Sequence, residues 1–102
     1  MSNRFSRYDS ADYLKTEEQI MLYLAACIEE DAGDGRLIAH ALGTIARARN
    51  MMQLARDTGL TREGLYKALS GEGNPSFATI LKVARALGLE LTMKPRTPVL
   101  LP

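Results

Sequence analysis

Residues 51–70, MMQLARDTGLTREGLYKALS, carry two short helical patterns on either side of a glycine, and this spacing constrains the fold more than any other stretch. Gly59 can adopt a positive φ without steric cost, so it ends the first helix abruptly and lets Thr61 cap the second with its hydroxyl. Ala55 is small enough to lie where two crossing helices approach closely. Four apolar positions point inward: Leu54, Leu60, Leu65 and Ala68. The sequence therefore predicts a helical corner whose second helix has an exposed outer face.

The outer face of this second helix carries four side chains that suit DNA: Arg62, Glu63, Tyr66 and Lys67. An arginine fork can bond guanine O6 and N7 together, and glutamate can accept from cytosine N4. Alternatives stay open, because Arg62 can also serve as a cation near phosphate, and Glu63 and Lys67 are four residues apart and can pair. Tyr66 can meet a thymine methyl or a phosphate, or pack across the helix. An ordinary helical hairpin in a small bundle would need the same small residue and glycine.

Three further polar residues lie at helix ends or in a loop, where free N–H groups and the helix dipole favour anions: Thr61, Ser70 and Asn74. Each could contact a DNA phosphate, and each is equally explained as a cap.

The charge is divided unevenly along the chain. Residues 1–35 carry three basic and eight acidic side chains, a net charge of −5, whereas residues 36–102 carry ten basic and four acidic ones, a net charge of +6. A basic segment suits a phosphate backbone. The acidic segment suits a basic protein partner, and solvation of a charged surface explains it equally well.

Helical patterns occupy most of the chain, so we expect an all-α fold of five helices. Thr16 and Gln19 form a capping box that opens a helix to about residue 31. Its inner stripe is Ile20, Leu24, Cys27 and Ile28, which Met21, Leu22 and Ala25 widen until little of its middle can face water. A short turn is expected over residues 10–14. A glycine-rich break at 32–35 precedes a second helix over residues 36–49, with inward Leu37, Ile38, Ala41, Leu42, Ile45 and Ala48.

Caps delimit the remaining elements. Asn50 caps the first helix of the corner, and either Asn74 or Ser76 caps a final helix that reaches about residue 87 and stops at Gly88. That helix is expected to bury Phe77, Ile80, Leu81, Ala84 and Leu87. Residues 89–94 alternate with a period of two and predict one short strand. Because a lone strand leaves its ladder groups unpaired, we expect it to pair with residues 4–8 or with its own copy, which would make a homodimer.

The length fits one core, divided into an acidic N-terminal helical extension (residues 1–35), a DNA-binding domain (36–88) and a C-terminal strand with a proline-containing tail (89–102). No apolar run approaches the roughly 20 residues of a membrane span, and the polar opening lacks a signal-peptide core, so we expect a cytoplasmic protein.

Cys27 and His40 are the only residues of their types and lack metal-ligand spacing, and the carboxylates at residues 17–18 and 29–31 are typical of solvated helix ends. We therefore expect no enzyme activity, cofactor or metal site.

The stretch ALGTIARARNMMQLARDTGLTREGLYKALSGEGNPSFATILKVARALGLEL resembles the HigA-like addiction-module antidotes, which combine IARAR, LYKALS, GNP and a final ALGL. The arrangement of helices around the corner is similar to the helix-turn-helix of phage repressors of the XRE/Cro type. Two departures are Asn50, where these proteins often have glycine, and Gly64, where serine is common. Glycine inside the second helix lowers its stability by about 1 kcal/mol.

This resemblance implies a repressor-like helix-turn-helix fold and a protein that binds its own operator in double-stranded DNA. It also implies neutralisation of a small basic toxin of the RelE/ParE/HigB type. Gln53 resembles the position that bonds a phosphate and braces the DNA-reading helix. The alternative is a stand-alone regulator of the XRE type that has no toxin partner.

Overall fold

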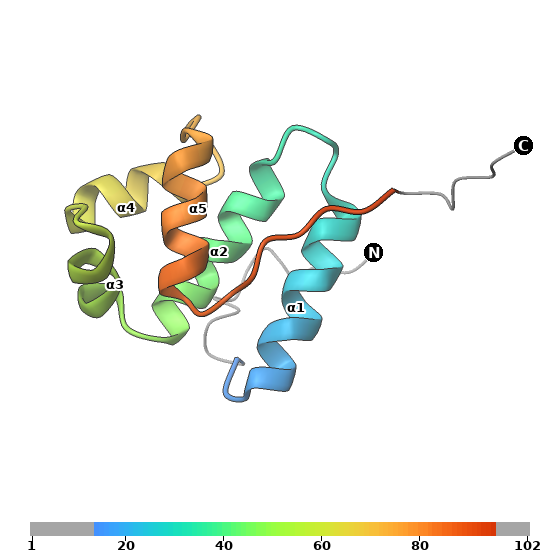
Figure 1. Ribbon diagram of the computed structural model, residues 1–102, viewed down its shortest axis with the longest axis horizontal. Helices are drawn as coiled ribbons and strands as arrows, with labels where there is room; N and C mark the ends of the chain where they lie inside the picture. The colour runs from blue at the N-terminus through green and yellow to red at the C-terminus, as the bar shows by residue number, and fades with distance from the viewer. Residues whose placement is uncertain (1–13, 96–102) are drawn as a thin grey trace, which may run out of the picture.

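The computed structural model describes residues 14–95, and over this range the protein is all-helical. The helices are α1 (Glu17–Glu30), α2 (Arg36–Ala48), α3 (Met51–Thr58), α4 (Arg62–Ala68) and α5 (Phe77–Ala86). Figure 1 shows α1 at one end of the molecule and α3 and α4 at the other, with α2 between them. None of the helices in the described range is long and apolar enough to cross a membrane. The expected turn at residues 10–14 and the pairing segment 4–8 lie largely or wholly outside that range.

Local capping interactions explain where the helices begin. Thr16 Oγ1 accepts the Gln19 N–H at 3.1 Å while Gln19 Oε1 accepts the Thr16 N–H at 3.1 Å, which confirms the predicted capping box. Asn50 caps α3 as predicted. Of the two candidates for α5, the cap is Ser76, whose Oγ accepts the Thr79 N–H at 3.1 Å. These helices therefore start at residues whose side chains satisfy otherwise unpaired N–H groups.

The apolar core draws on every helix. α2 packs against each of the other four helices, and α3 also contacts α4 and α5. The buried residues of this cluster are Leu14, Ile20, Leu42, Ile45, Ala46, Leu54, Leu65, Leu69, Val83 and Leu87. Because Leu14 and Ile20 belong to the same cluster as residues of α4 and α5, α1 is part of the folded core.

The outer side of α1 differs from expectation. Ile20 and Cys27 are buried as predicted, but Ile28 of the predicted inner stripe faces solvent, and so do the residues expected to widen that stripe: Met21, Leu22 and Ala25. The prediction that little of this helix meets water was therefore wrong. α2 is the main neighbour of α1, and one neighbour covers only one side of a helix. Phe77, predicted to be buried, is also exposed at the start of α5.

Asp31 connects α1 to α2 across the glycine-rich loop. Its Oδ2 accepts the N–H groups of Gly33 at 2.8 Å and Gly35 at 3.0 Å, and its Oδ1 accepts those of Leu37 at 2.9 Å and Ile38 at 3.3 Å. These bonds to the charged carboxylate lower the pKa of Asp31, the bond from Gly35 most strongly. Asp31 thus caps α2 from across the loop, whereas the sequence had placed it among solvated charges.

Residues 89–95 form no strand in the described part of the chain, which corrects the expectation for residues 89–94. They continue from the end of α5 as an extended segment (Figure 1). Leu89 packs against the core, while Leu91 and Met93 are exposed. The physical reason is that a strand needs a neighbouring strand for its ladder hydrogen bonds, and the other described residues are helices and connecting loops.

Candidate nucleic-acid interface

The corner between α3 and α4 is fixed by hydrogen bonds at both helix ends. Gly59 has φ 77°, and its N–H donates to the Ala55 carbonyl oxygen at 2.9 Å, which closes α3. Two residues later Thr61 Oγ1 accepts the Gly64 N–H at 2.9 Å and opens α4. The positive φ would strain a side-chain-bearing residue, so glycine suits this corner. Both predicted roles, for Gly59 and for Thr61 as a cap, are confirmed.

α4 is anchored by its inner side. Leu65 is fully buried and Leu69 is nearly so. α2 approaches the end of α4 so closely that a Cβ placed on Gly43 would lie 2.8 Å from the Leu69 carbonyl oxygen and 3.1 Å from the Leu69 Cβ. These contacts fix the position of α4 and leave its opposite side to solvent.

The exposed side of α4 carries Arg62, Glu63, Tyr66 and Lys67. Within residues 14–95 the side chains of Arg62, Glu63 and Lys67 make no hydrogen bond or ion pair, so the alternative that Glu63 and Lys67 pair with each other is not realised. Two cations and one carboxylate therefore stand on a rigidly held helix without protein partners in the described chain. This arrangement can donate to and accept from groups on another molecule.

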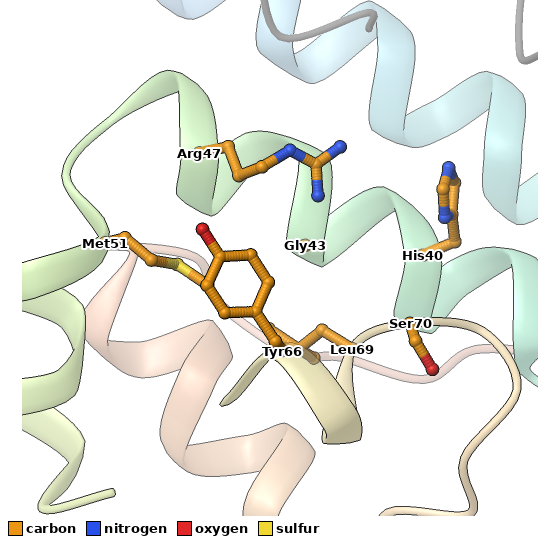
Figure 2. Close-up of a pocket in the computed structure, with 7 residues that line it drawn as sticks. All are labelled: His40, Gly43, Arg47, Met51, Tyr66, Leu69 and Ser70. Atoms are coloured by element: carbon orange, nitrogen blue, oxygen red, sulfur yellow. The ribbon is translucent and has the colours of Figure 1, made fainter. Parts of the chain in front are cut away.

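A hollow of about 180 Å³ adjoins this side of α4. Its lining residues come from α2, α3, α4 and the residues after α4: His40, Gly43, Arg47, Met51, Tyr66, Leu69 and Ser70. In Figure 2 the Tyr66 ring lies across the hollow with its hydroxyl on the side of Arg47. The exposed side of α4 thus continues onto α2.

Arg47 and His40 were not among the predicted site residues. They lie seven residues apart in α2 with Gly43 between them, a spacing that puts all three on one helix face. Sequence reasoning could have found this face from the unusual glycine, because a glycine inside a helix often marks close approach of a second backbone.

The other predicted site residues are spread more widely. Ser70 adjoins the hollow beside α4, but its Oγ donates to the Lys67 carbonyl oxygen at 3.2 Å and accepts the Glu72 N–H at 3.1 Å, as a turn residue does. Asn74 is exposed and lines a separate hollow with Arg36 and Phe77. The structure therefore brings Ser70, but not Asn74, to the hollow beside Tyr66.

Gln53 lies on the exposed side of α3, within a chain of side-chain hydrogen bonds. Its Nε2 donates to Asp57 Oδ1 at 2.8 Å, and its Oε1 accepts from Arg56 Nη2 at 2.9 Å. A phosphate bound by Gln53 would have to replace one of these partners. The Arg56 guanidinium would then lie close enough to pair with the phosphate. In the described range no three His, Cys, Asp or Glu residues lie together so that they could hold a metal ion.

Comparison with known proteins gives one family. A family model described as "probable addiction module antidote protein" matches residues 4–95. An uncharacterized protein of Haemophilus influenzae is 53% identical over 94 residues, which cover 92% of this chain and 95% of the relative. No solved structure matches.

Proposed function

The chain belongs to the family of probable addiction module antidote proteins, and from this premise we propose that it is a DNA-binding repressor that also neutralises a toxin. In this proposal it acts in the cytoplasm as a binding module rather than an enzyme. It represses its own operon through an operator in double-stranded DNA, and its protein partner is a small basic toxin of the RelE/ParE/HigB type.

The DNA-binding half of the proposal rests on one observation, the unpaired polar side of α4. We propose that α3 and α4 are a helix-turn-helix of the kind found in phage repressors and HigA-like antidotes. The start of α4 would then enter the major groove, with Arg62 and Glu63 at base edges and Lys67 farther along. Arg62 would bond a guanine through its fork. The hydroxyl of Tyr66 and the cation of Arg47 would lie beside the same groove wall.

A homodimer completes this proposal, because repressors of this type read two half-sites about 34–36 Å apart. Residues 90–95 are extended and form no backbone hydrogen bond in the described chain, so a second copy could supply the missing strand. Gln53, Thr61, Ser70 and Asn74 are proposed to contact phosphates, which position the protein without reading sequence.

The test is binding to the DNA upstream of the protein's own coding sequence, at several salt concentrations. Arg62→Ala should lose about 1–3 kcal/mol, roughly 5–150-fold in Kd, and should relax the preference at one base pair. Lys67→Ala should weaken operator and unrelated DNA evenly and reduce the salt slope by about 1. The two variants therefore separate base reading from phosphate contact.

Lys15→Ala is the matched control. Lys15 is exposed, precedes α1 and belongs to neither helix of the α3–α4 corner, so removal of its charge should leave the affinity unchanged. Wild-type binding that does not respond to salt, or equal losses in all three variants, would refute recognition of DNA by α4.

A further inference from the structure

The side of α1 that faces away from the core forms an apolar surface between two acidic ends. Met21 is 51% exposed, Leu22 65% and Ile28 51%. We define the α1 outer face as Glu18, Met21, Leu22, Ala25, Ile28 and Glu29, all of them exposed. At 100° per residue these six positions fall within about a third of the helix circumference, so they form one continuous face. Exposed apolar side chains that gather on one helix face are typical of an interaction surface.

The charges of this face are of one sign. Glu18 and Glu29 stand at its two ends, eleven residues apart in sequence, which corresponds to about 16 Å along the helix. α1 contains no lysine or arginine. Neither carboxylate is hydrogen-bonded or ion-paired within residues 14–95, whereas Glu17, at the edge of this face one turn before Met21, is paired with Arg49 at 2.8 Å. The described chain thus neutralises Glu17 and leaves Glu18 and Glu29 uncompensated.

A second copy of the chain fits this face poorly. If two copies paired along α1 in opposite directions, Glu18 of one would meet Glu29 of the other. If they paired in the same direction, each glutamate would meet its own counterpart. Both arrangements bring like charges together beside a desolvated apolar patch, with no basic residue on α1 to offset them. A partner of opposite charge removes this cost.

We propose that the α1 outer face receives the toxin, through an apolar patch on the toxin that is flanked by basic side chains about 16 Å apart. This inference rests on the proposed function, which supplies a small basic partner, and adds the surface that binds it. Apolar side chains in the middle of the patch would carry most of the affinity, and the charges at the ends would orient the encounter.

The helix is held in place before any partner arrives. Its inner side is buried through Ile20 and Cys27, its first turn is closed by the capping box, and Asp31 ties its end to α2. A preformed face costs little conformational entropy on binding. The same burial means that removal of residues 1–35 would expose the core, so single side chains are the appropriate change for a test.

The experiment measures the affinity of the full chain for the purified product of the adjacent reading frame. Leu22→Ala combined with Ile28→Ala should weaken binding about 10–100-fold. Glu18→Gln combined with Glu29→Gln should slow association and flatten its dependence on salt. Because all four side chains are exposed, the apolar double variant should keep the wild-type melting temperature, and both double variants should keep the wild-type affinity for DNA.

Matched controls come from other elements. Met52→Ala removes an apolar side chain of similar exposure on α3, and Glu72→Gln removes an exposed carboxylate from the loop after α4. Neither should change binding of the partner. Loss of affinity in the controls equal to that in the double variants would overturn the proposed surface.

The possible outcomes separate this inference from the function on which it rests. If the wild-type chain binds the partner and both double variants bind it equally well, the α1 surface is wrong and the antidote function stands. If the wild-type chain does not bind it, the toxin half of the proposed function fails, and this inference with it. If the apolar variant instead changes the mass of the free protein or lowers its melting temperature, a second copy or another part of the chain covers the face, and the inference is refuted.

Discussion

At the scale of single residues, Asp31 joins the end of α1 to the start of α2. One carboxylate accepts four backbone N–H groups, two from the loop and two from the first turn of α2. α2 has Gly35 at its N-terminal boundary, which has no side chain to offer as a cap. Asp31 takes over that task, and its negative charge also lies favourably at the positive end of the α2 dipole.

The lowered pKa of Asp31 makes this contribution depend on pH. The carboxylate titrates below the ordinary value of 3.8 in the folded protein. Its stabilising effect is therefore fully present above pH 3.8 and is lost as the pH falls below that value through the folded pKa. The midpoint of thermal unfolding should fall over this acidic range.

Replacement of Asp31 by alanine tests the assignment. Asp31→Ala should lower the melting temperature at neutral pH and should show a shallower fall on acidification than the wild-type protein. Asp34→Ala is the control, because Asp34 lies in the same loop but, within residues 14–95, accepts only the Arg36 N–H, two residues ahead, and lies 3.7 Å from the Arg36 side chain. An equal loss in the two variants would contradict the role of Asp31.

Some of the capping residues could be identified from the sequence, and others could not. Thr16, Asn50 and Thr61 cap through bonds to a residue three positions ahead, so the local sequence suffices to identify them. Asp31 reaches Leu37 and Ile38, six and seven positions ahead, and that reach depends on the loop conformation. Arg47 joins the α4 surface only because α2 and α4 pack together.

At the scale of elements, the helices and the buried sides of α2, α3 and α4 followed from periodicity and caps, whereas the exposure of one side of α1 did not. The apolar residues of α1 lie on two sides, and periodicity alone cannot say which side the rest of the chain covers. Apolar side chains such as Met21, Leu22 and Ile28 become buried wherever another element packs against them. α2 packs only against the opposite side of α1. Residues 89–94 have the alternation of a strand, but a strand also needs a neighbour, which the alternation does not supply.

The close approach of Gly43 to Leu69 predicts a sensitive position in α2. Gly43→Ala should lower the free energy of unfolding by about 1–3 kcal/mol, because the new Cβ would meet the backbone of Leu69, which cannot rotate away. Alanine is otherwise the better helix former by about 1 kcal/mol, so a loss isolates the clash from helix propensity. Chemical denaturation measures this change in the free energy of unfolding.

The wider effect of Gly43→Ala should appear at α4. A displaced Leu69 would shift the end of α4, so DNA affinity should fall together with stability. Gly43→Ser, which adds one more atom, should lower both further. A stabilised alanine variant would show that α2 and α4 can separate without cost.

At the scale of the whole molecule, the two proposed surfaces lie at opposite ends. α1 and α4 are on either side of α2 (Figure 1), and the Glu17–Arg49 ion pair joins α1 to the C-terminal boundary of α2 on the way to α3. A protein on the α1 outer face would therefore not occupy the groove-facing side of α4. Charge follows the same division, since the acidic segment precedes α2 and the basic one begins with it.

This separation predicts that partner and operator bind together. Partner protein added to the preformed complex with operator DNA should give a larger complex in gel-shift and sedimentation measurements. Its affinity for the DNA-bound chain should differ by less than about fivefold from that for the free chain, because the sites share no side chain. Release of the DNA by stoichiometric partner would contradict the arrangement.

Because α2 is central, a single proteolytic cut in this helix would affect both proposed surfaces. Each of the other four helices rests on α2, and the apolar cluster cannot survive without it. A protease that cuts once within α2 would abolish the proposed promoter binding and the proposed toxin capture in the same event. The two activities would then decay with one half-life, and loss of repression would coincide with release of free toxin.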